Sequence, residues 1–279
     1  TSSTGSYGYK VAAQMLKALE DALGGEYTVT VNPYPATTAA MKATMNGEAE
    51  IGYTADVGMT QVYNNEGPFK DFKAEKGRMV HTWYAYPMES FMAVYAPKAE
   101  QFKSLRDFSG KPVFFTPAGF MNWLNFQRTF KALGYEFKHV QIGESAQADA
   151  LQAGTVIGAV AYTTAGRSLP SYWRETELRL DIKVINPTPE EIKKLTDKNL
   201  APTEIDAKQV FSKDVGVQKI LGVPLLFGYN MRADMPEEVV YKMLSKFYAE
   251  REVPQRIRPG ETSGQTPSEP RSRVPFCWI

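Results

Sequence analysis

Short apolar runs and segments of helical periodicity alternate along this chain of 279 residues. In residues 11–23 apolar side chains return every three or four positions, which predicts an amphipathic helix that ends at Gly24 and Gly25. Strands that alternate with helices of this length indicate an α/β fold with parallel sheets. Further helices are predicted at residues 37–46, 56–63, 121–133, 144–153 and 168–177, from residue 188, and from 234 to about 249. Strands are predicted at residues 27–31, 51–54, 80–86, 90–95, 111–115, 137–141, 156–162, 181–185 and 222–232.

Small polar residues occupy the turn between an apolar strand and the next helix at five places. They lie at residues 3–6, 34–38 and 53–56 in the first half of the chain and at 115–119 and 162–166 in the second. In an open α/β sheet such turns lie at the carboxyl ends of the strands, where ligands bind. Each turn also begins a helix whose unpaired N–H groups and dipole attract an anion. Two such sets in one chain predict two lobes that hold one small ligand between them.

Composition and charge narrow the classes of function. The formal net charge of +1 and the lack of a basic stripe argue against nucleic-acid binding. The longest apolar runs, at residues 113–115, 156–161 and 222–227, are too short to cross a bilayer. The only cysteine is Cys277, which excludes an internal disulfide and a cysteine-based zinc site. The chain begins at Thr1, and a cleaved secretory signal or an engineered start would each explain this.

The residue pattern offers little for catalysis. His81 and His139 are the two histidines, and both lie in strand-like segments, where a lone histidine is usually structural. No His-Glu-x-x-His, Gly-x-Ser-x-Gly or Walker-type motif occurs. The acidic pairs at residues 190–191 and 237–238 fall in first helical turns, where the helix dipole accounts for them. We therefore expect no catalytic residue, no metal site and no cofactor.

Residues 251–279 differ from the rest of the chain. Prolines are mixed there with Arg, Ser and Gly, and the hydrophobic periodicity is lost. Such a segment cannot bury enough surface to order itself. We expect it to be disordered or foreign to the fold, with a shifted reading frame as one origin.

Six segments of the chain, taken in order, match the motifs of one known family. Thr-Gly-Ser-Tyr-Gly-Tyr at residues 4–9 is similar to a Thr-Gly-Gly-x-Tyr-Tyr opening, and Asn-Gly-Glu-Ala-Glu-Ile-Gly at 46–52 resembles a Gly-Glu-Ala-Asp-Leu-Gly segment. Ser-Leu-Arg-Asp-Phe-Ser-Gly-Lys at 104–111 is similar to a Ser-Leu-x-Asp-Leu-x-Gly-Lys entry to a second lobe. The other matching segments are residues 148–154, 164–166 and 232–241. Over about residues 1–250 the chain thus resembles the TAXI-type solute receptors of TRAP transporters.

The resemblance implies the two-lobed, type II-like periplasmic binding-protein fold, with a ligand cleft between lobes that are joined by hinge strands. The first lobe is expected from residues 1–92 and 218–250 and the second from residues 93–217, with the hinge near residues 86–97 and 185–222. The implied function is that of a periplasmic receptor that closes on a small organic anion, a carboxylate for example, and delivers it to the membrane subunit of a TRAP transporter. We expect a monomer with no nucleic-acid partner. Two alternatives stay open: an enzyme acting on a small organic acid on the same fold, and a ligand-sensing domain.

The strand-to-helix turns supply the candidate ligand-binding residues. The family's second-lobe loop is rich in glycine, whereas here Phe120 and Met121 stand in it, and Arg167 follows Thr-Ala-Gly where the family often has an aromatic residue. Amino-acid specificity such as glutamate is therefore not carried over, and a ligand with an apolar or aromatic part is indicated. Arg167 would pair with a ligand carboxylate through its two-donor fork or would lie free on the surface, and Asp56 would cap its helix or accept a ligand hydroxyl or ammonium. Arg128 is expected to point away from the cleft, and the other candidates could instead be helix caps or core side chains. The candidates are Thr4, Gly5, Ser6, Tyr7, Thr37, Thr38, Thr54, Asp56, Tyr86, Thr116, Ala118, Gly119, Phe120, Asn122, Tyr162, Thr163, Thr164 and Arg167.

Overall fold

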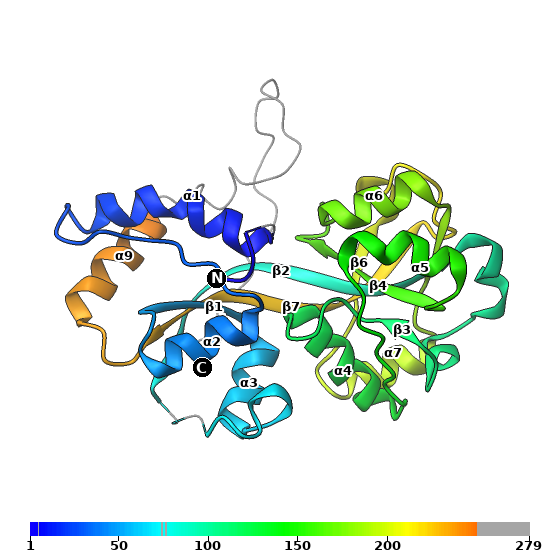
Figure 1. Cartoon of the computed structure of the whole chain (residues 1–279), viewed down its shortest axis with the longest axis horizontal. Helices are drawn as coiled ribbons and strands as arrows, with labels where there is room; N and C mark the ends of the chain where they lie inside the picture. Colours follow the sequence, from blue (N-terminus) through cyan, green and yellow to red (C-terminus); the bar gives the residue numbers. More distant parts are fainter. Residues whose placement is uncertain (5, 74, 76, 250–279) are drawn as a thin grey trace.

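The computed structural model describes residues 1–4, 6–73, 75 and 77–249. The predicted tail at residues 251–279 lies outside these ranges, and so does Gly5. Figure 1 shows two groups of helices, here called the first and the second lobe, with a pair of long strands, β2 and β7, running from one to the other. This is the two-lobed α/β arrangement that the sequence predicts.

The two long strands are antiparallel to each other and belong to both lobes. β2 (Met79–Tyr95) pairs along most of its length with β7 (Lys219–Arg232). β1 (Ile51–Ala55) pairs with the first-lobe half of β7, whereas β4 (Gly158–Thr164) and β5 (Ile182–Ile185) pair with the second-lobe half of β2. Any rotation of one lobe against the other therefore has to bend β2 and β7.

The continuity of β2 corrects one prediction. The sequence predicts two strands, at residues 80–86 and 90–95, that are separated at Pro87, but β2 continues through the proline. Register shifts in the β2–β7 pair fall just before Pro87. Pro87 lies opposite Leu226, whose own N–H donates to Asp56 and not to β2, so no ladder bond to β7 requires the missing N–H of the proline.

The prediction of parallel sheets is wrong for most of the sheet. The strands lie in the order β1-β7-β2-β4-β3, with β5 beside β2 and β6 (Thr203–Asp206) beside β7. Among strand pairs in the described part of the chain, β3 (Val113–Phe114) with β4 is the parallel one. The reason is that β2 and β7 run in opposite directions between the lobes, and their other neighbours pair antiparallel to them. Residues 27–31, predicted as a strand, are irregular, and His139 in the predicted strand at 137–141 makes only an isolated bridge to Val113.

The first lobe packs its helices around β1 and the adjoining halves of β2 and β7 (Figure 1). Its core joins methionines of two helices, such as Met15 and Met41, to Tyr53 on β1 and to Phe227 and Tyr229 on β7. A smaller cluster joins Leu19, Leu23 and Met231 to Met243 on the last helix. The elements are α1 (Tyr7–Ala22), α2 (Thr37–Asn46), α3 (Asp56–Asn64), η1 (Gly67–Phe69) and α9 (Glu237–Ala249).

The second lobe has a core on each face of its part of the sheet. One core contains Phe91 and Trp173 under α5 and α6, and the other contains Phe115, Phe126 and Phe130 under α4 and α7. All five of these aromatic side chains are at most 2% exposed, so large aromatic rings lie at the centre of both cores. The elements are η2 (Ala96–Gln101), η3 (Leu105–Phe108), α4 (Met121–Leu133), η4 (Glu144–Ala146), α5 (Gln147–Ala153), α6 (Ser171–Arg179), α7 (Pro189–Thr196) and α8 (Ala207–Val210).

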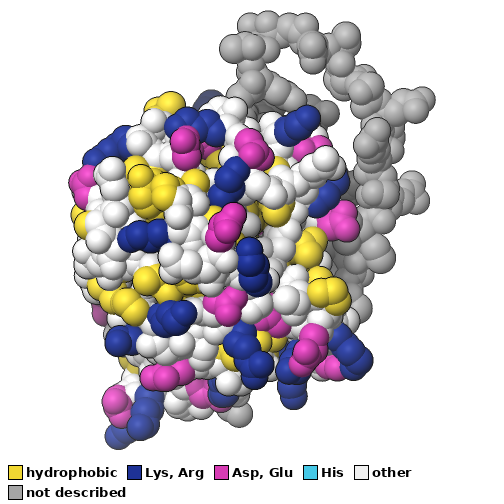
Figure 2. All heavy atoms as spheres, turned by 90° about the vertical axis from the view of Figure 1, so that its right-hand side faces the viewer, with side chains coloured by type: hydrophobic (Ala, Val, Ile, Leu, Met, Phe, Trp, Pro, Cys, Tyr) yellow, Lys and Arg dark blue, Asp and Glu magenta, His cyan; other side chains and the backbone are white. Residues whose placement is uncertain are grey.

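Charges of both signs are mixed on the surface. Figure 2 shows this for the end of the molecule that carries the second lobe, where lysines and arginines alternate with acidic side chains. Many of them form ion pairs one helical turn apart, as Lys193–Asp197 and Lys194–Glu190 do on α7. Within the described residues, no helix has the length and apolar character needed to span a membrane.

Candidate functional site between the lobes

Two of the predicted turns, one from each lobe, touch at the seam between the lobes. The backbone N–H of Thr38, at the start of α2, donates to the carbonyl oxygen of Gly119, in the loop before α4, over 3.3 Å. Gly119 has a φ of +88°, and a Cβ atom there would lie 3.0 Å from both Ala36 Cβ and Thr38 Oγ1. Glycine is therefore the residue that allows this backbone shape and this close approach. The structure brings Thr37, Thr38 and Gly119 together, as expected, with both threonines buried.

A buried contact continues the seam beneath these turns. The hydroxyl of Thr54, at the end of β1, lies 2.8 Å from Met41 Sδ in its own lobe and 3.8 Å from Met121 Sδ of the second lobe. Thr54 is fully buried, and Met121 belongs to the core cluster of the first lobe. Thr54 is thus at the seam, but its surroundings are sulfur and apolar groups.

An ion pair links the lobes beside the long strands. Arg128 Nη1 donates to Asp56 Oδ2 over 2.6 Å, and Arg128 Nη2 donates to the carbonyl oxygen of Pro224 over 3.0 Å. The other oxygen of Asp56 accepts the backbone N–H of Leu226, at 2.9 Å. The prediction that Arg128 points away from the seam is wrong, because the guanidinium reaches across it. Both carboxylate oxygens of Asp56 have partners, and its helix takes Ala55 as the N-cap, so the predicted capping role is wrong, while the predicted ligand contact stays a prediction.

Tyrosines from both lobes gather at the same seam. Tyr7, at the start of α1, meets Tyr86 edge-on with ring centroids 5.1 Å apart, and the hydroxyls of Tyr86 and Tyr53 lie 2.5 Å apart. Burial raises the pKa of Tyr53, the Tyr86 hydrogen bond lowers it, and nearby tyrosines raise it further, among them Tyr162 of the second lobe. Tyr162 also packs against the core clusters of both lobes. Tyr86, which is 8% exposed, is mainly a core residue, whereas Tyr7 and Tyr162 are half-buried at the boundary.

The predicted turn at residues 162–166 is hydrogen-bonded to a residue that the sequence did not reveal as part of the site. Glu89, on β2, accepts the hydroxyl of Thr163 at 2.6 Å and the backbone N–H of Gly166 at 3.0 Å through the same oxygen. Glu89 is 3% exposed, so burial raises its pKa, against the two hydrogen bonds, which act to lower it. The backbone N–H of Thr164 donates to Ser168. The sequence signal that could have identified Glu89 is that it is the one acidic residue in the otherwise mainly apolar sequence of β2.

Arg167 stands on this same turn. Its side chain is exposed, and within the described residues its guanidinium has no hydrogen bond or ion pair. Both predicted roles, a partner for a ligand carboxylate and a free surface arginine, fit this placement. The binding role of Arg167 stays a prediction.

The loop before α4 has a strained backbone, and its polar groups are bonded mainly to other segments of the protein. Thr116 has a φ of +72° and is fully buried, and its hydroxyl has no hydrogen-bond partner. The backbone N–H of Ala118, predicted to face a ligand, donates to Gln141 Oε1 at 3.0 Å. Asn122 Oδ1 accepts the hydroxyl of Ser90 at 2.8 Å, so it holds β2. Phe120 is half-buried as the N-cap of α4 and supplies no side-chain cap.

The first predicted turn acts as a helix cap. Ser6 is the N-cap of α1, where its hydroxyl accepts the backbone N–H of Tyr9 at 3.1 Å and the hydroxyl of Ser2 at 2.9 Å. Thr4 is exposed, and Gly5 lies outside the described residues. The capping role predicted as the alternative for this turn is the one that the structure contains.

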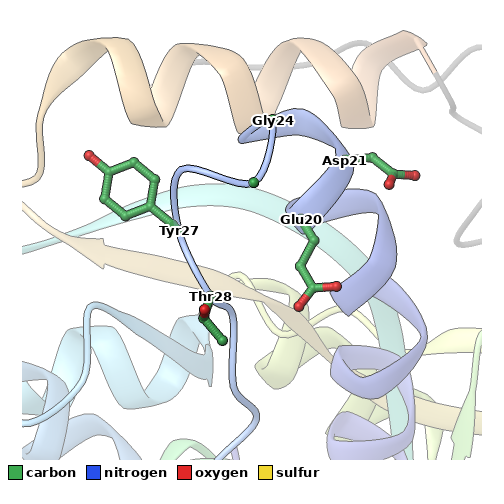
Figure 3. A pocket seen from close by; sticks show the side chains of 6 residues that line it. Glu20, Asp21, Gly24, Tyr27 and Thr28 are labelled. Carbon is green, nitrogen blue, oxygen red and sulfur yellow. The ribbon is translucent and has the colours of Figure 1, made fainter.

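Two hollows on the surface lie away from this seam. One is lined by Glu20, Asp21, Gly24, Gly25, Tyr27 and Thr28 at the end of α1, and Figure 3 shows their side chains beside that helix and under α9. The other is lined by Met45, Asn46, Phe72, Lys73, Glu75 and Arg78. Neither contains a predicted site residue. Within the described residues, no group of three or more His, Cys, Asp or Glu side chains could hold a metal ion.

Comparison with known proteins supports the fold. A putative L-cystine ABC transporter protein from Listeria monocytogenes has a TM-score of 0.51 at 12% identity, covering 88% of this chain and 83% of its own. The periplasmic aliphatic sulphonate binding protein SsuA from Escherichia coli has a TM-score of 0.50 at 14% identity, covering 92% and 75%. The predicted two-lobed periplasmic binding-protein fold is confirmed. A search of curated protein sequences found no match. A sequence profile of the NMT1-like family matches residues 1–259, and the chain therefore belongs to the NMT1-like family.

Proposed function

We propose that this member of a solute-binding receptor family is a periplasmic receptor of the TAXI type. It would bind a small organic anion between its lobes and deliver it to the membrane subunit of a TRAP transporter. The observation that carries this proposal is the meeting of α2 and the loop before α4, from opposite lobes, at Thr38 and Gly119.

The two helices that begin at this meeting point favour an anion. Neither α2 nor α4 has a side-chain hydrogen bond at its N-cap, and neither has an acidic residue in its first turn. By contrast α7, on the far side of α4, has a complete capping box and two acids in its first turn. The first N–H groups of α2 and α4 are therefore not offset by local side-chain charge, and their dipoles favour a negative group at the seam.

Lobe closure supplies the mechanism of capture. The hydrogen bond between Thr38 and Gly119 joins the lobes directly, so it exists only when they are closed. A ligand that contacts both lobes also makes all its contacts only in that form, and its binding shifts the population toward closure. β2 and β7 would bend as the hinge. A membrane partner could then distinguish loaded from empty receptor by the closed shape.

Within this proposal the side chains around the seam suggest the ligand's chemistry. Phe120 and Met121 stand where the resembling family has small residues, and Tyr162 lies half-buried at the boundary between the lobes, which favours an apolar or aromatic part. Arg167 would pair with the ligand's carboxylate through two parallel N–H donors. The tyrosines would stay protonated, because burial raises the pKa of Tyr53, Tyr86 and Tyr162.

A thermal-shift screen tests the receptor function. The panel contains mono- and dicarboxylates, aromatic acids, amino acids and aliphatic sulphonates. A compound at a hundred times its dissociation constant should add about 2.7 kcal/mol to the free energy of unfolding. Proton NMR of the stabilising compound after incubation should show it unchanged, and its conversion to a product would favour an enzyme instead. A panel without any stabilising acid would contradict the anion assignment.

Two further experiments test the proposed role of Arg167 and the proposed TRAP partner. Arg167→Gln should weaken binding of the stabilising acid about tenfold or more, since a charged hydrogen-bonding pair is lost. Arg106→Gln, at another exposed arginine of the second lobe, is the matched control and should bind like the wild type. In proteoliposomes the loaded protein should support uptake through a TRAP membrane subunit. Uptake through an ABC permease in its place would refute the TRAP assignment.

A further inference from the structure

The side chain of His139 packs against the loop that precedes α4 and is hydrogen-bonded to it. Its segment runs beside β3, with the N–H of Val140 bonded to the carbonyl of Val113 at 2.9 Å. From there the backbone N–H of Phe115 donates to His139 Nδ1 at 3.3 Å, and His139 Nε2 lies 3.0 Å from Gln141 Oε1. The same Gln141 oxygen accepts the backbone N–H of Ala118 at 3.0 Å. One imidazole and one amide thus fasten the loop on both sides of Thr116.

These contacts fix the protonation state of the imidazole. A backbone N–H can only donate, so Nδ1 of His139 must be the unprotonated acceptor. The proton of the neutral ring then sits on Nε2 and donates to Gln141 Oε1, which is consistent with the second donor that this oxygen receives from Ala118. If the ring took up a second proton, Nδ1–H would face the N–H of Phe115. The bond to the loop would be replaced by two opposed donors.

The loop needs such external support because its backbone is strained. Thr116 is β-branched and has a φ of +72°, in the region that such residues rarely occupy, and its buried hydroxyl lacks a partner. Gly119, at +88°, completes the turn against Thr38. A residue held in this region persists only where its surroundings force it. The hydrogen bonds that the His139 and Gln141 side chains accept from Phe115 and Ala118 are the polar contacts that hold the loop in this shape.

The surroundings of His139 favour its neutral form. The rings packed against it are Phe114 on β3, Phe115 just after it, Trp123 on α4 and Phe137 on its own segment, with centroids 5.9–6.3 Å away. Burial lowers the pKa of His139, and the hydrogen bond to Gln141 acts in the opposite direction. No charged group of the described residues adds to these two causes. Lys138, next in sequence, is exposed.

From this geometry we propose that His139 is a positioning residue whose neutral imidazole, with Gln141, holds residues 115–119 in the shape that meets the first lobe, and whose protonation releases them. Because the neutral form is favoured in the fold, the loop is held fully above the ordinary histidine pKa of 6.5 and loses its support as the pH falls below that value. Weaker capture of solute at acidic pH would follow, and this consequence alone rests on the proposed function.

Hydrogen exchange measured by NMR on the full chain tests the proposal without a ligand. The probe is the amide of Phe115, which donates to His139 Nδ1, expressed as a protection factor so that the intrinsic pH dependence of exchange is removed. Between about pH 8 and the acidic pH at which the His139 ring protons have finished titrating, the protection of the Phe115 amide should fall about tenfold in the wild type, the effect of losing one hydrogen bond. In His139→Asn, which keeps a side-chain acceptor but does not titrate, the protection should be the same at both pH values. His81→Asn, at the other histidine of the chain, should keep the wild-type response.

The outcomes separate cleanly. The proposal is overturned if wild-type protection does not change with pH, or if His139→Asn shows the same change as the wild type. Should His139→Asn fail to fold, the wild type decides by itself: the His139 ring protons and the Phe115 amide must titrate with one midpoint, and different midpoints would refute the link. None of these results depends on a solute. The failure of the solute screen and the failure of this proposal are therefore distinguishable.

Discussion

Replacing Glu191 by glutamine should lower the free energy of unfolding by about 1–3 kcal/mol, because this one side chain supports two helices of the second lobe. The carboxylate of Glu191 is 3% exposed. One oxygen accepts the backbone N–H of Arg106 at 3.0 Å and the hydroxyl of Tyr135 at 2.8 Å. The other accepts the backbone N–H of Thr188 at 2.8 Å and of Leu105 at 3.3 Å.

The magnitude follows from what the amide would face. Glutamine keeps one oxygen and replaces the other by an NH2 group. With the NH2 group toward Tyr135, whose hydroxyl can also accept, one buried donor, the backbone N–H of Arg106, is left without an acceptor. Each buried donor left without an acceptor costs about 1–3 kcal/mol. Glu190, the preceding residue, is the matched control, since its exposed side chain pairs only with Lys194 one turn away, at 2.8 Å. Glu190→Gln should cost no more than about 0.5 kcal/mol.

Urea denaturation followed by circular dichroism measures both variants. The slope of the free energy against urea should stay constant, so that a shifted midpoint reports stability alone. The reasoning is refuted if Glu191→Gln stays within about 0.5 kcal/mol of the wild type, or if the two variants lose the same amount.

Two further predictions concern the seam. Gly119→Ala should lose more than about 1 kcal/mol of stability and widen the molecule in solution scattering, because both the positive φ and the contact with Thr38 oppose a Cβ. Gly134→Ala is the control for backbone strain alone, because Gly134 has a φ of +75° but no atom within 4 Å of an added Cβ. An equal loss of stability in both variants would show that the contact between residue 119 and Thr38 does not matter. In a double-mutant cycle of Asp56→Asn and Arg128→Gln, unfolding in urea should give a coupling energy of about 1 kcal/mol, and additive losses would show that the pair does not join the lobes.

The helices could be predicted well from sequence because their limits are local. The predicted helices at residues 37–46 and 121–133 coincide with α2 and α4. Each is followed by a glycine with positive φ, Gly47 at +83° and Gly134 at +75°, which is the usual end of a helix. The apolar spacing and the terminating glycine lie within the same short segment, so the limits of these helices can be predicted without knowing which distant residues pack against them.

The sheet and the site depend on distant partners, and there the sequence was insufficient. The apolar pattern of residues 80–95 does not reveal that β7, more than a hundred residues later, pairs with it through Pro87. Glu89 becomes a fastening point only because Thr163 and Gly166 fold back onto it. The partner of Arg128 is 72 positions away. Spacing within one helix could not indicate that its side chain crosses to the first lobe.

The distribution of helix caps connects stability with the proposed function. α7 lies within one lobe, and its N-terminus is fully paired by Thr188 and Glu191. α2 and α4 begin at the seam, where a serine or aspartate cap would stabilise each helix by about 1 kcal/mol. Ala36 and Phe120 stand in those positions and provide no such bond. Natural proteins depart from local rules mainly at functional or strained sites. The N–H of Thr38 already donates to Gly119, but under the proposed function a cap carboxylate would place a second negative charge where the anion is expected, so the missing caps fit a receptor for anions.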